Sequence, residues 1–181
     1  MIKPSQVILL VEDSRHQQFI FRYLRTAGLE PRAVRIEKSP SGAGSAEQWV
    51  RERFPIEVQA YRARHAQTTL IVLIDADTQT VHQRRRQLDH ALREAGVTLI
   101  GDTEAIARLV PKRNVETWIL CLNDIVVDEG ADYKRTRNDW PGLTHTAAVT
   151  LYGWSRPNKA LLPSCVESLR LGIQELRKAA L

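Results

Sequence analysis

The residues best suited to chemistry are Asp75 and Asp77, which end an apolar run over Thr68–Thr78, TTLIVLIDADT. Side chains alternate along extended backbone, so these two carboxylates can point to the same side. Paired carboxylates repel at neutral pH unless a proton, a cationic side chain or a metal lies between them, and oxygen ligands favour Mg²⁺ or Mn²⁺. The spacing therefore predicts a magnesium or manganese site. The alternative is an aspartate that caps a following helix at Thr78 or Gln79.

A second acidic position follows another apolar run, Gln6–Val11, which leads into Glu12 and Asp13. Both runs suit strands that are buried on both faces of a parallel sheet, and such strands open a ligand crevice at their carboxyl ends. If the two strands are neighbours, Glu12 joins Asp75 and Asp77 at one edge of the sheet. Asp13 points the other way in extended backbone. Three carboxylates suit one or two magnesium ions, which position a phosphodiester and polarise its phosphorus–oxygen bonds.

The elements that position these acids follow a β-α-β-α-β-α order. The helix after the first strand should begin with Ser14 as N-cap and stop at Gly28. The next elements are a short strand over Pro31–Glu37, a glycine-containing connection over residues 39–45, a helix over Ala46–Ala66 that Pro55 breaks or kinks, and a helix that ends at Gly96. On that last helix Val81, Leu88, Leu92 and Ala95 form an apolar stripe, which leaves residues 84–86 mainly on the solvent side. Right-handed crossovers then give one mostly parallel sheet with helices on both faces.

Downstream, we expect a fourth strand, a short helix, a polar loop and a last helix. The expected ranges are Ala105–Val110 for the strand, Val115–Leu122 for a helix capped by Asn114, Gly130–Thr144 for the loop, and a helix after an N-cap at Ser164 with Val166, Leu169, Ile173, Leu176 and Ala180 on its apolar side. A polar, basic loop is typical of a segment that contacts a ligand. The chain thus predicts one domain, with an α/β core over residues 1–122 and a C-terminal loop and helical extension over residues 123–181 packed on it.

The charge of the chain permits an anionic partner. Of 181 residues, 26 are basic and 21 acidic, for a net charge of +5. Four basic residues are predicted to bind nucleic acid: Arg84 and Arg85, which closely follow the aspartate pair, and Lys134 and Arg135 in the later loop. Solvated helix faces are the alternative. No apolar run reaches membrane-spanning length, so we expect a cytoplasmic protein with no membrane partner. Two isolated cysteines, at positions 121 and 165, are expected to be buried free thiols.

A glutamate that ends the first strand and a D-x-D motif that ends the third resemble the TOPRIM domain of primases, type IA and II topoisomerases and OLD-family nucleases. The stretches LVPKRNVETWIL, DYK and SLRLGIQELRKA resemble small stand-alone TOPRIM-like proteins encoded beside ABC- or SMC-type ATPases in bacterial defence loci. The resemblance implies a TOPRIM-like Rossmannoid α/β fold and a magnesium-dependent (or manganese-dependent) nuclease or nuclease-like effector subunit. Its partners would be nucleic acid, an ABC/SMC-type ATPase and, in a homo-oligomer, further copies of the chain.

Carried over residue by residue, the resemblance implies roles for six positions. Glu12 would be a metal ligand or general acid/base, Asp75 and Asp77 metal ligands, and Lys112, Arg113 and Glu116 further catalytic residues. Asp13 stands where the TOPRIM pattern has glycine, and residues 14–16 lack the further acid of OLD-type nucleases. One metal is therefore better supported than two.

Two other interpretations remain open. The opening VILLVEDSRHQQFIFRYLRTAGLE also resembles a response-regulator receiver domain, in which Asp75 would accept a phosphoryl group and Lys112 would be the lysine after the last strand. The connection to Asp75 is longer than in a receiver. A non-catalytic TOPRIM-fold binding module is the third interpretation. His16 and His82 have no nucleophile at a recognisable spacing and are not predicted to be catalytic. The tryptophans at 118, 140 and 154 are expected to be core or interface anchors.

Overall fold

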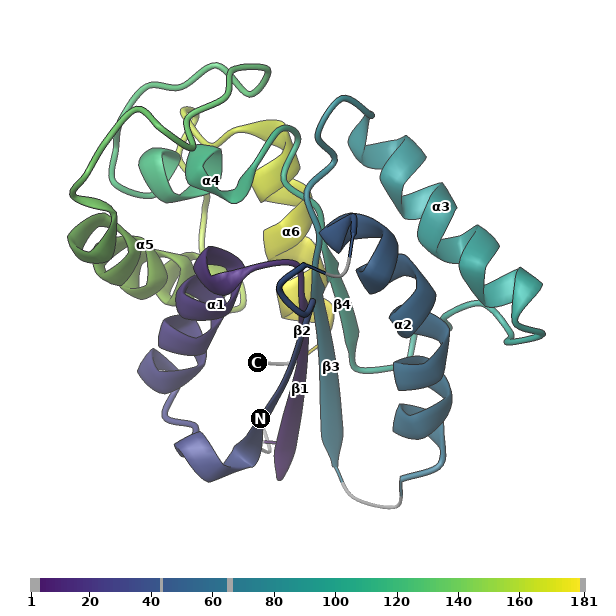
Figure 1. The fold of residues 1–181 in the computed structure, drawn as a ribbon. Coiled ribbons are helices and arrows are strands. Elements are labelled where there is room, and N and C mark those ends of the chain that lie inside the picture. The colour runs from purple at the N-terminus through teal and green to yellow at the C-terminus, as the bar shows by residue number, and fades with distance from the viewer. Residues whose placement is uncertain (1–3, 43, 65–66, 180–181) are drawn as a thin grey trace.

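A parallel four-stranded sheet forms the centre of the computed structural model, which describes residues 4–42, 44–64 and 67–179. The strands are β1 (Gln6–Val11), β2 (Val34–Lys38), β3 (Thr68–Leu73) and β4 (Ile106–Leu109), in the order β2-β1-β3-β4 (Figure 1). In the register of the central pair, Gln6 lies opposite Thr68 and Val11 opposite Leu73. The predicted parallel α/β sheet is confirmed. Because β1 and β3 are neighbours, the residues that follow them lie side by side.

Helices cover both faces of this sheet (Figure 1). They are α1 (Ser14–Thr26), α2 (Ala46–Arg62), α3 (Val81–Glu94), α4 (Val115–Cys121), α5 (Trp140–Ser155) and α6 (Glu167–Lys178). Successive strand side chains point to opposite faces. Val7, Leu9 and Val11 therefore pack under α1, α4, α5 and α6, whereas Ile8 and Leu10 pack under α2 and α3. The expectation of helices on both faces is confirmed.

The segment after residue 122 packs into the larger of these two cores. Helix α5 lies against α1, and α6 lies against the edge strand β4. Trp118 of α4 is fully buried in the same core, and its Nε1 donates a hydrogen bond to Ser168 Oγ of α6 at 2.7 Å. Gly172 of α6 lies so close to this indole that a Cβ built there would be 2.4 Å from its Cη2 atom. The C-terminal helices are thus a structural part of the α/β fold.

Some predicted element ends in the first half need correction. Asp13, not Ser14, caps α1, because its extended backbone lets Oδ1 accept hydrogen bonds from the Arg15 and His16 amides. The expected strand over Pro31–Glu37 begins as a 3₁₀ turn over Pro31–Ala33 and becomes a strand only at Val34. Helix α2 continues without a break through Pro55, which is buried. This helix ends at Arg62, with Ala63 as its C-cap, which is earlier than the expected end at Ala66; Ala66 itself falls outside the described residues.

The second half shows similar shifts. The predicted loop over Gly130–Thr144 ends earlier, because α5 begins at Trp140, with Pro141 in its first turn, where a missing amide costs nothing. Val166 rather than Ser164 occupies the N-cap position of α6. Asn114 does precede α4, but its side-chain amide donates to Asp132 instead of capping the helix. Ala180 lies outside the described residues.

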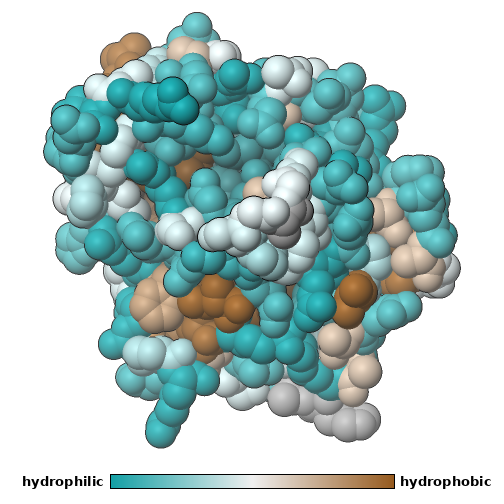
Figure 2. Space-filling view, in the orientation of Figure 1, coloured by the Kyte–Doolittle hydropathy of each residue, from teal (hydrophilic) through white to brown (hydrophobic). Residues whose placement is uncertain are grey.

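The surface in the view of Figure 2 is mostly hydrophilic, with small separate hydrophobic patches. Within residues 4–42, 44–64 and 67–179, no helix combines the length and apolar character needed to cross a bilayer. Cys121 and Cys165 are buried and unpaired, as predicted.

Candidate functional site

The site lies where β1 and β3 end, side by side, at the centre of the sheet. The chain leaves β1 towards β2 and reaches β3 on the opposite side of β1, so the strand order reverses between these two strands. Helix α1 follows β1 on one face, and α3 follows β3 on the other. In open parallel sheets, such a reversal leaves a crevice outside the carboxyl ends of the strands, where ligands bind. Glu12 and Asp75 come from this position.

Three side chains meet there: Glu12, His16 and Asp75, which we name the acidic cluster. One potential ligand atom from each lies within 4.8 Å of the others. His16 Nε2 is 3.0 Å from Asp75 Oδ1, and the amide of Asp75 donates to Glu12 Oε1. His16 reaches the cluster because Asp13 caps α1 and turns the first helical residues back over the strand ends.

Burial and charge shift the pKa values of this cluster. Burial raises the pKa of Glu12 to about 7, and the charge of Asp75 acts in the same direction while His16 opposes it. Burial alone would lower the pKa of His16, but the charge and hydrogen bond of Asp75 raise it to about 10. Without a metal, His16 is therefore an imidazolium at neutral pH and neutralises part of the acidic charge.

The acidic cluster fits a divalent metal ion. Asp75 Oδ2 and His16 Nδ1 are buried and have no hydrogen-bond partner among the described residues. Two carboxylates and one imidazole suit Mn²⁺, Zn²⁺ and similar ions, while Mg²⁺ prefers oxygen ligands alone. A ligating histidine must be neutral, so a metal would have to displace the proton of His16. The donor set thus supports metal binding without fixing the ion.

Asp77 lies outside the acidic cluster as the structure describes it. Its backbone turns into the left-handed region, with φ of 54°, and its side chain is 41% exposed. Its Oδ2 atom is 3.7 Å from Nη2 of Arg84. The alternative that an aspartate caps the next helix is wrong, because Thr80 caps α3 through a reciprocal pair of bonds with Gln83. A metal-ligand role for Asp77 stays a prediction.

The predicted solvent-facing position of the α3 arginines is wrong for Arg84, which is only 4% exposed. Its Nε donates to the backbone oxygen of Asp75 at 2.9 Å, and its Nη1 pairs with Glu47 of α2. Burial is tolerated because the guanidinium is both paired and hydrogen-bonded. Arg85 reaches towards Glu175 of α6, at 3.5 Å. Arg84 therefore holds the turn after β3, and a nucleic-acid-binding role for it stays a prediction.

The other predicted site residues differ in how close they lie to the acidic cluster. Glu116 is 3% exposed and pairs with Nε of Arg15 at 3.0 Å, and burial raises its pKa. Lys134 Nζ lies 3.5 Å from Asp75 Oδ2, although not in hydrogen-bond geometry. Lys112 donates instead to the backbone oxygen of Gln79 at 3.2 Å, and Arg113 is half-buried in the same connection.

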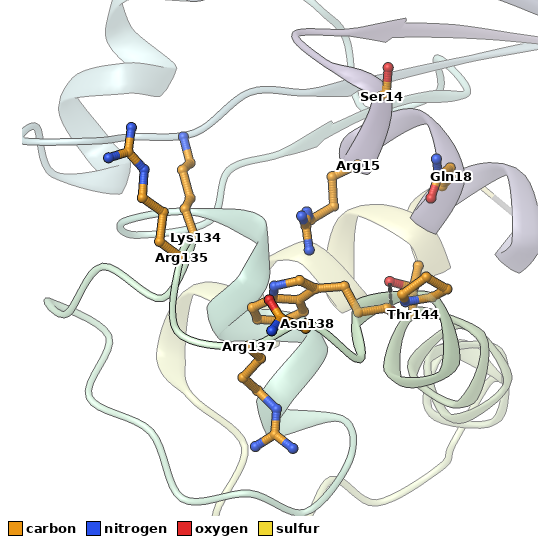
Figure 3. A pocket seen from close by; sticks show the side chains of 10 residues that line it. Ser14, Arg15, Gln18, Lys134, Arg135, Arg137, Asn138 and Thr144 are labelled. Atoms are coloured by element: carbon orange, nitrogen blue, oxygen red, sulfur yellow. Dashed lines mark hydrogen bonds between the residues drawn. The ribbon is translucent and has the colours of Figure 1, made fainter.

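A cavity of about 560 Å³ opens beside the cluster, between the N-terminal turns of α1 and α5 and the loop before α5 (Figure 3). We name it the basic pocket. Its lining includes Ser14, Arg15, Lys134, Arg135, Arg137 and Trp140, and none of its lining residues is acidic. Figure 3 shows Arg15 on one side and Lys134 with Arg135 on the other. Of the two predicted basic loop residues, Lys134 therefore lies next to the acidic cluster, and Arg135 lines the pocket beside it.

Sequence reasoning missed His16, Arg15 and the pocket role of Trp140. The one available signal for His16 is its position four residues after Glu12, which becomes meaningful only when Asp13 starts the helix. Arg15 and Trp140 lie 125 positions apart, yet Cζ of Arg15 is 4.6 Å from the centre of the indole ring. No local spacing predicts that contact.

The fold and the cluster define a small parallel α/β domain with a candidate metal centre at the reversal of its strand order. Comparisons with models of known protein families, with curated proteins and with solved structures found no match to this chain.

Proposed function

We propose that this protein is a divalent-metal-dependent phosphodiester hydrolase, a TOPRIM-like nuclease or nuclease-like effector subunit that acts on nucleic acid. The observation that supports this most is the meeting of Glu12, His16 and Asp75 at the ends of adjacent parallel strands, directly beside a basic pocket. Metal ligands next to phosphate-binding cations form the arrangement that phosphodiester hydrolysis needs.

Each group has a chemical role in this proposal. Glu12, His16 and Asp75 would hold the ion, which would supply Lewis-acid stabilisation of phosphate charge. Glu12 would be either a ligand of the ion or the group that exchanges a proton; burial raises its pKa to about 7 in the metal-free cluster, and a bound cation would lower that pKa. Lys134 lies beside Asp75 and Arg15 beside Glu116, so both cations can neutralise phosphate charge of a strand that is bound next to the ion.

The nature of the substrate and of a regulator rests on the resemblance stated above. It implies nucleic acid as substrate and control by an ABC- or SMC-type ATPase. The cations at the pocket agree with a phosphate-containing substrate. A receiver-type signalling function is less well supported, because the side chain of Asp75 is only 1% exposed and already bonded to His16.

A cleavage assay tests the proposal. Internally labelled single- and double-stranded DNA and RNA are incubated with the protein and Mn²⁺, Mg²⁺ or EDTA. We expect cleavage with Mn²⁺ and none with EDTA. Asp75→Asn and Glu12→Gln should each reduce it at least about a hundredfold, as expected when charged groups at a reacting centre are removed. The matched control is Asp102→Asn, because Asp102 is fully exposed and far from the cluster in the fold.

Circular dichroism and thermal melting of all variants separate loss of chemistry from loss of fold. Full Mn²⁺-dependent activity in Asp75→Asn would contradict the proposal. Absence of cleavage and of metal binding in the wild type would favour the non-catalytic binding module. Acetyl phosphate addresses the receiver alternative, since only a phosphoacceptor should gain a hydroxylamine-labile phosphate on Asp75.

A further inference from the structure

The basic pocket carries more positive charge than its contacts neutralise. Arg137 pairs with Asp139 at 2.8 Å and points away from Arg15 in Figure 3. Arg135 is exposed and forms no ion pair within the described part of the chain. Arg15 pairs with Glu116 at 3.0 Å, and Lys134 lies 3.5 Å from Asp75. Beside the paired Arg137, three cationic residues, Arg15, Lys134 and Arg135, thus line a cavity without an acidic lining residue.

One wall of the basic pocket is a stacked pair, Arg15 on the ring of Trp140. Trp140 is 6% exposed, and its indole Nε1 has no partner among the described residues. Arg15 rests on that ring, which fixes the guanidinium, and its Nη1 atom is likewise buried and unpartnered. Both donor atoms are buried behind the pocket wall, and what the stacked Arg15 presents to a ligand is a positive charge held in place.

Charge and size select the kind of ligand. An internal phosphodiester carries one negative charge, whereas a terminal phosphate monoester carries about −1.5 to −2 near neutral pH and offers three acceptor oxygens. Three cations in one concave site match the monoester better. The cavity of about 560 Å³ has the size of a small-molecule site and has room for a phosphate with its nucleoside.

The residues of the acidic cluster do not line the basic pocket, which adjoins them through Lys134 and through Arg15, the neighbour of His16. A phosphate in the pocket is therefore held beside the candidate metal centre and not on it. We propose that the basic pocket binds the terminal phosphate monoester of a nucleic-acid strand. This inference rests on the proposed function for its ligand class, and it makes that function specific for strand ends.

Binding without metal tests the inference separately from cleavage. Three internally labelled single strands of one sequence carry a 5′-phosphate, a 3′-phosphate or hydroxyls at both ends, and their anisotropy is measured in EDTA. We expect one phosphate-ended strand to bind about tenfold more tightly than the hydroxyl-ended strand, the gain of one charge-assisted hydrogen bond. Sets of DNA and RNA identify the sugar, and the matching nucleoside monophosphate should compete where the nucleoside does not.

Single substitutions test which residue causes the preference for a strand with a terminal phosphate. Arg135→Gln should reduce the end preference to about twofold or less, because Arg135 contributes charge that no neighbouring acid neutralises. Its exposure makes the substitution safe for the fold. Arg93→Gln is the control, since Arg93 is an exposed arginine of α3 on the other face of the sheet and should leave the preference unchanged.

The outcomes separate this inference from the proposed function. Equal binding of the three strands, or a preference that survives in Arg135→Gln, overturns the terminal-phosphate site even if Mn²⁺-dependent cleavage occurs. A preference that depends on Arg135 supports the site, and it does so even if no cleavage is found, because the pocket would then serve a non-catalytic binding module.

Discussion

His16 Nε2 lies 3.0 Å from Asp75 Oδ1, and both side chains are only 1% exposed. The pair joins the first turn of α1 to the end of β3 and puts a positive charge between acidic groups that would otherwise repel. A proton on His16 and a metal ion are thus alternative ways to neutralise the same cluster. The apparent affinity for metal therefore includes the cost of removing that proton.

The metal-free protein should lose stability as the pH rises through the range in which His16 deprotonates. The pKa of His16 is raised from 6.5 to about 10, since the charge and hydrogen bond of Asp75 outweigh burial. Its stabilising contribution is full below pH 6.5, falls above that, and is lost above about pH 10. In His16→Gln the part of this loss that comes from His16 should be absent, a difference on the order of a few kcal/mol, while the smaller loss from the ionisation of Glu12 near pH 7 remains. Urea unfolding in EDTA at several pH values measures it, and parallel curves for both proteins would contradict it.

Asp75 and Asp77 should differ in their importance for metal binding. Asp77 has a positive φ, is 41% exposed and lies 3.7 Å from Arg84, and it is not one of the three residues that meet in the acidic cluster. Asp77→Asn should weaken Mn²⁺ binding by less than about fivefold, the effect of an exposed charge near the ion that does not bind it. Asp75→Asn should abolish it. Isothermal titration with Mn²⁺ compares them, and equal losses would restore Asp77 as a ligand.

Lys134→Met should separate metal binding from catalysis. The ammonium group competes with a cation for Asp75, so its removal should strengthen Mn²⁺ binding by up to about fivefold, a modest gain because the side chain is 42% exposed. Cleavage should fall by about a hundredfold or more, since the charge that faces the phosphate is lost. Lys159→Met, at an exposed position after α5, is the matched control. Weaker metal binding in Lys134→Met would show that the lysine supports the cluster instead.

Gly172→Ala should destabilise the fold through Trp118. A Cβ at this position would lie 2.4 Å from Cη2 of the buried indole, which has no room to move. Overpacking of this kind costs about 1–3 kcal/mol. The control is Gly153→Ala in α5, where a Cβ meets nothing within 4 Å and should stabilise the helix by about 0.5–1 kcal/mol. Thermal unfolding should shift in opposite directions, and equal shifts would refute this account of the α4–α6 contact.

The sheet could be predicted because its signals are local. The apolar runs before Glu12 and Asp75 specify buried parallel strands. Gly28 and Gly96 mark the ends of helices, where the backbone takes the left-handed conformation that favours glycine, with φ of 81° and 68°. Element starts were less predictable. Asp13 and Ser14 are both good N-caps, and the choice between them depends on where the strand stops.

The composition of the site was only partly predictable because its members come from distant segments. Glu12 and Asp75 follow from strand ends, but the inclusion of His16 depends on the helix start, and that of Lys134 on the path of a long loop. The predicted solvent-facing position of Arg84 is wrong because the apolar stripe of α3 does not reveal the partners that allow an arginine to be buried. Those partners are Glu47 and the backbone oxygen of Asp75.

Helix α6 has one more effect on the molecule. Strand β4 is at the edge of the sheet, and the amide of Arg108 in that strand donates to Oε2 of Glu175 in α6 at 2.9 Å. An edge amide that is already occupied is not free to pair with a strand of another molecule. A shortened protein that ends at Ser164 would expose this edge together with Trp118. We therefore expect such a fragment to aggregate on expression, even though every strand of the sheet would still be present.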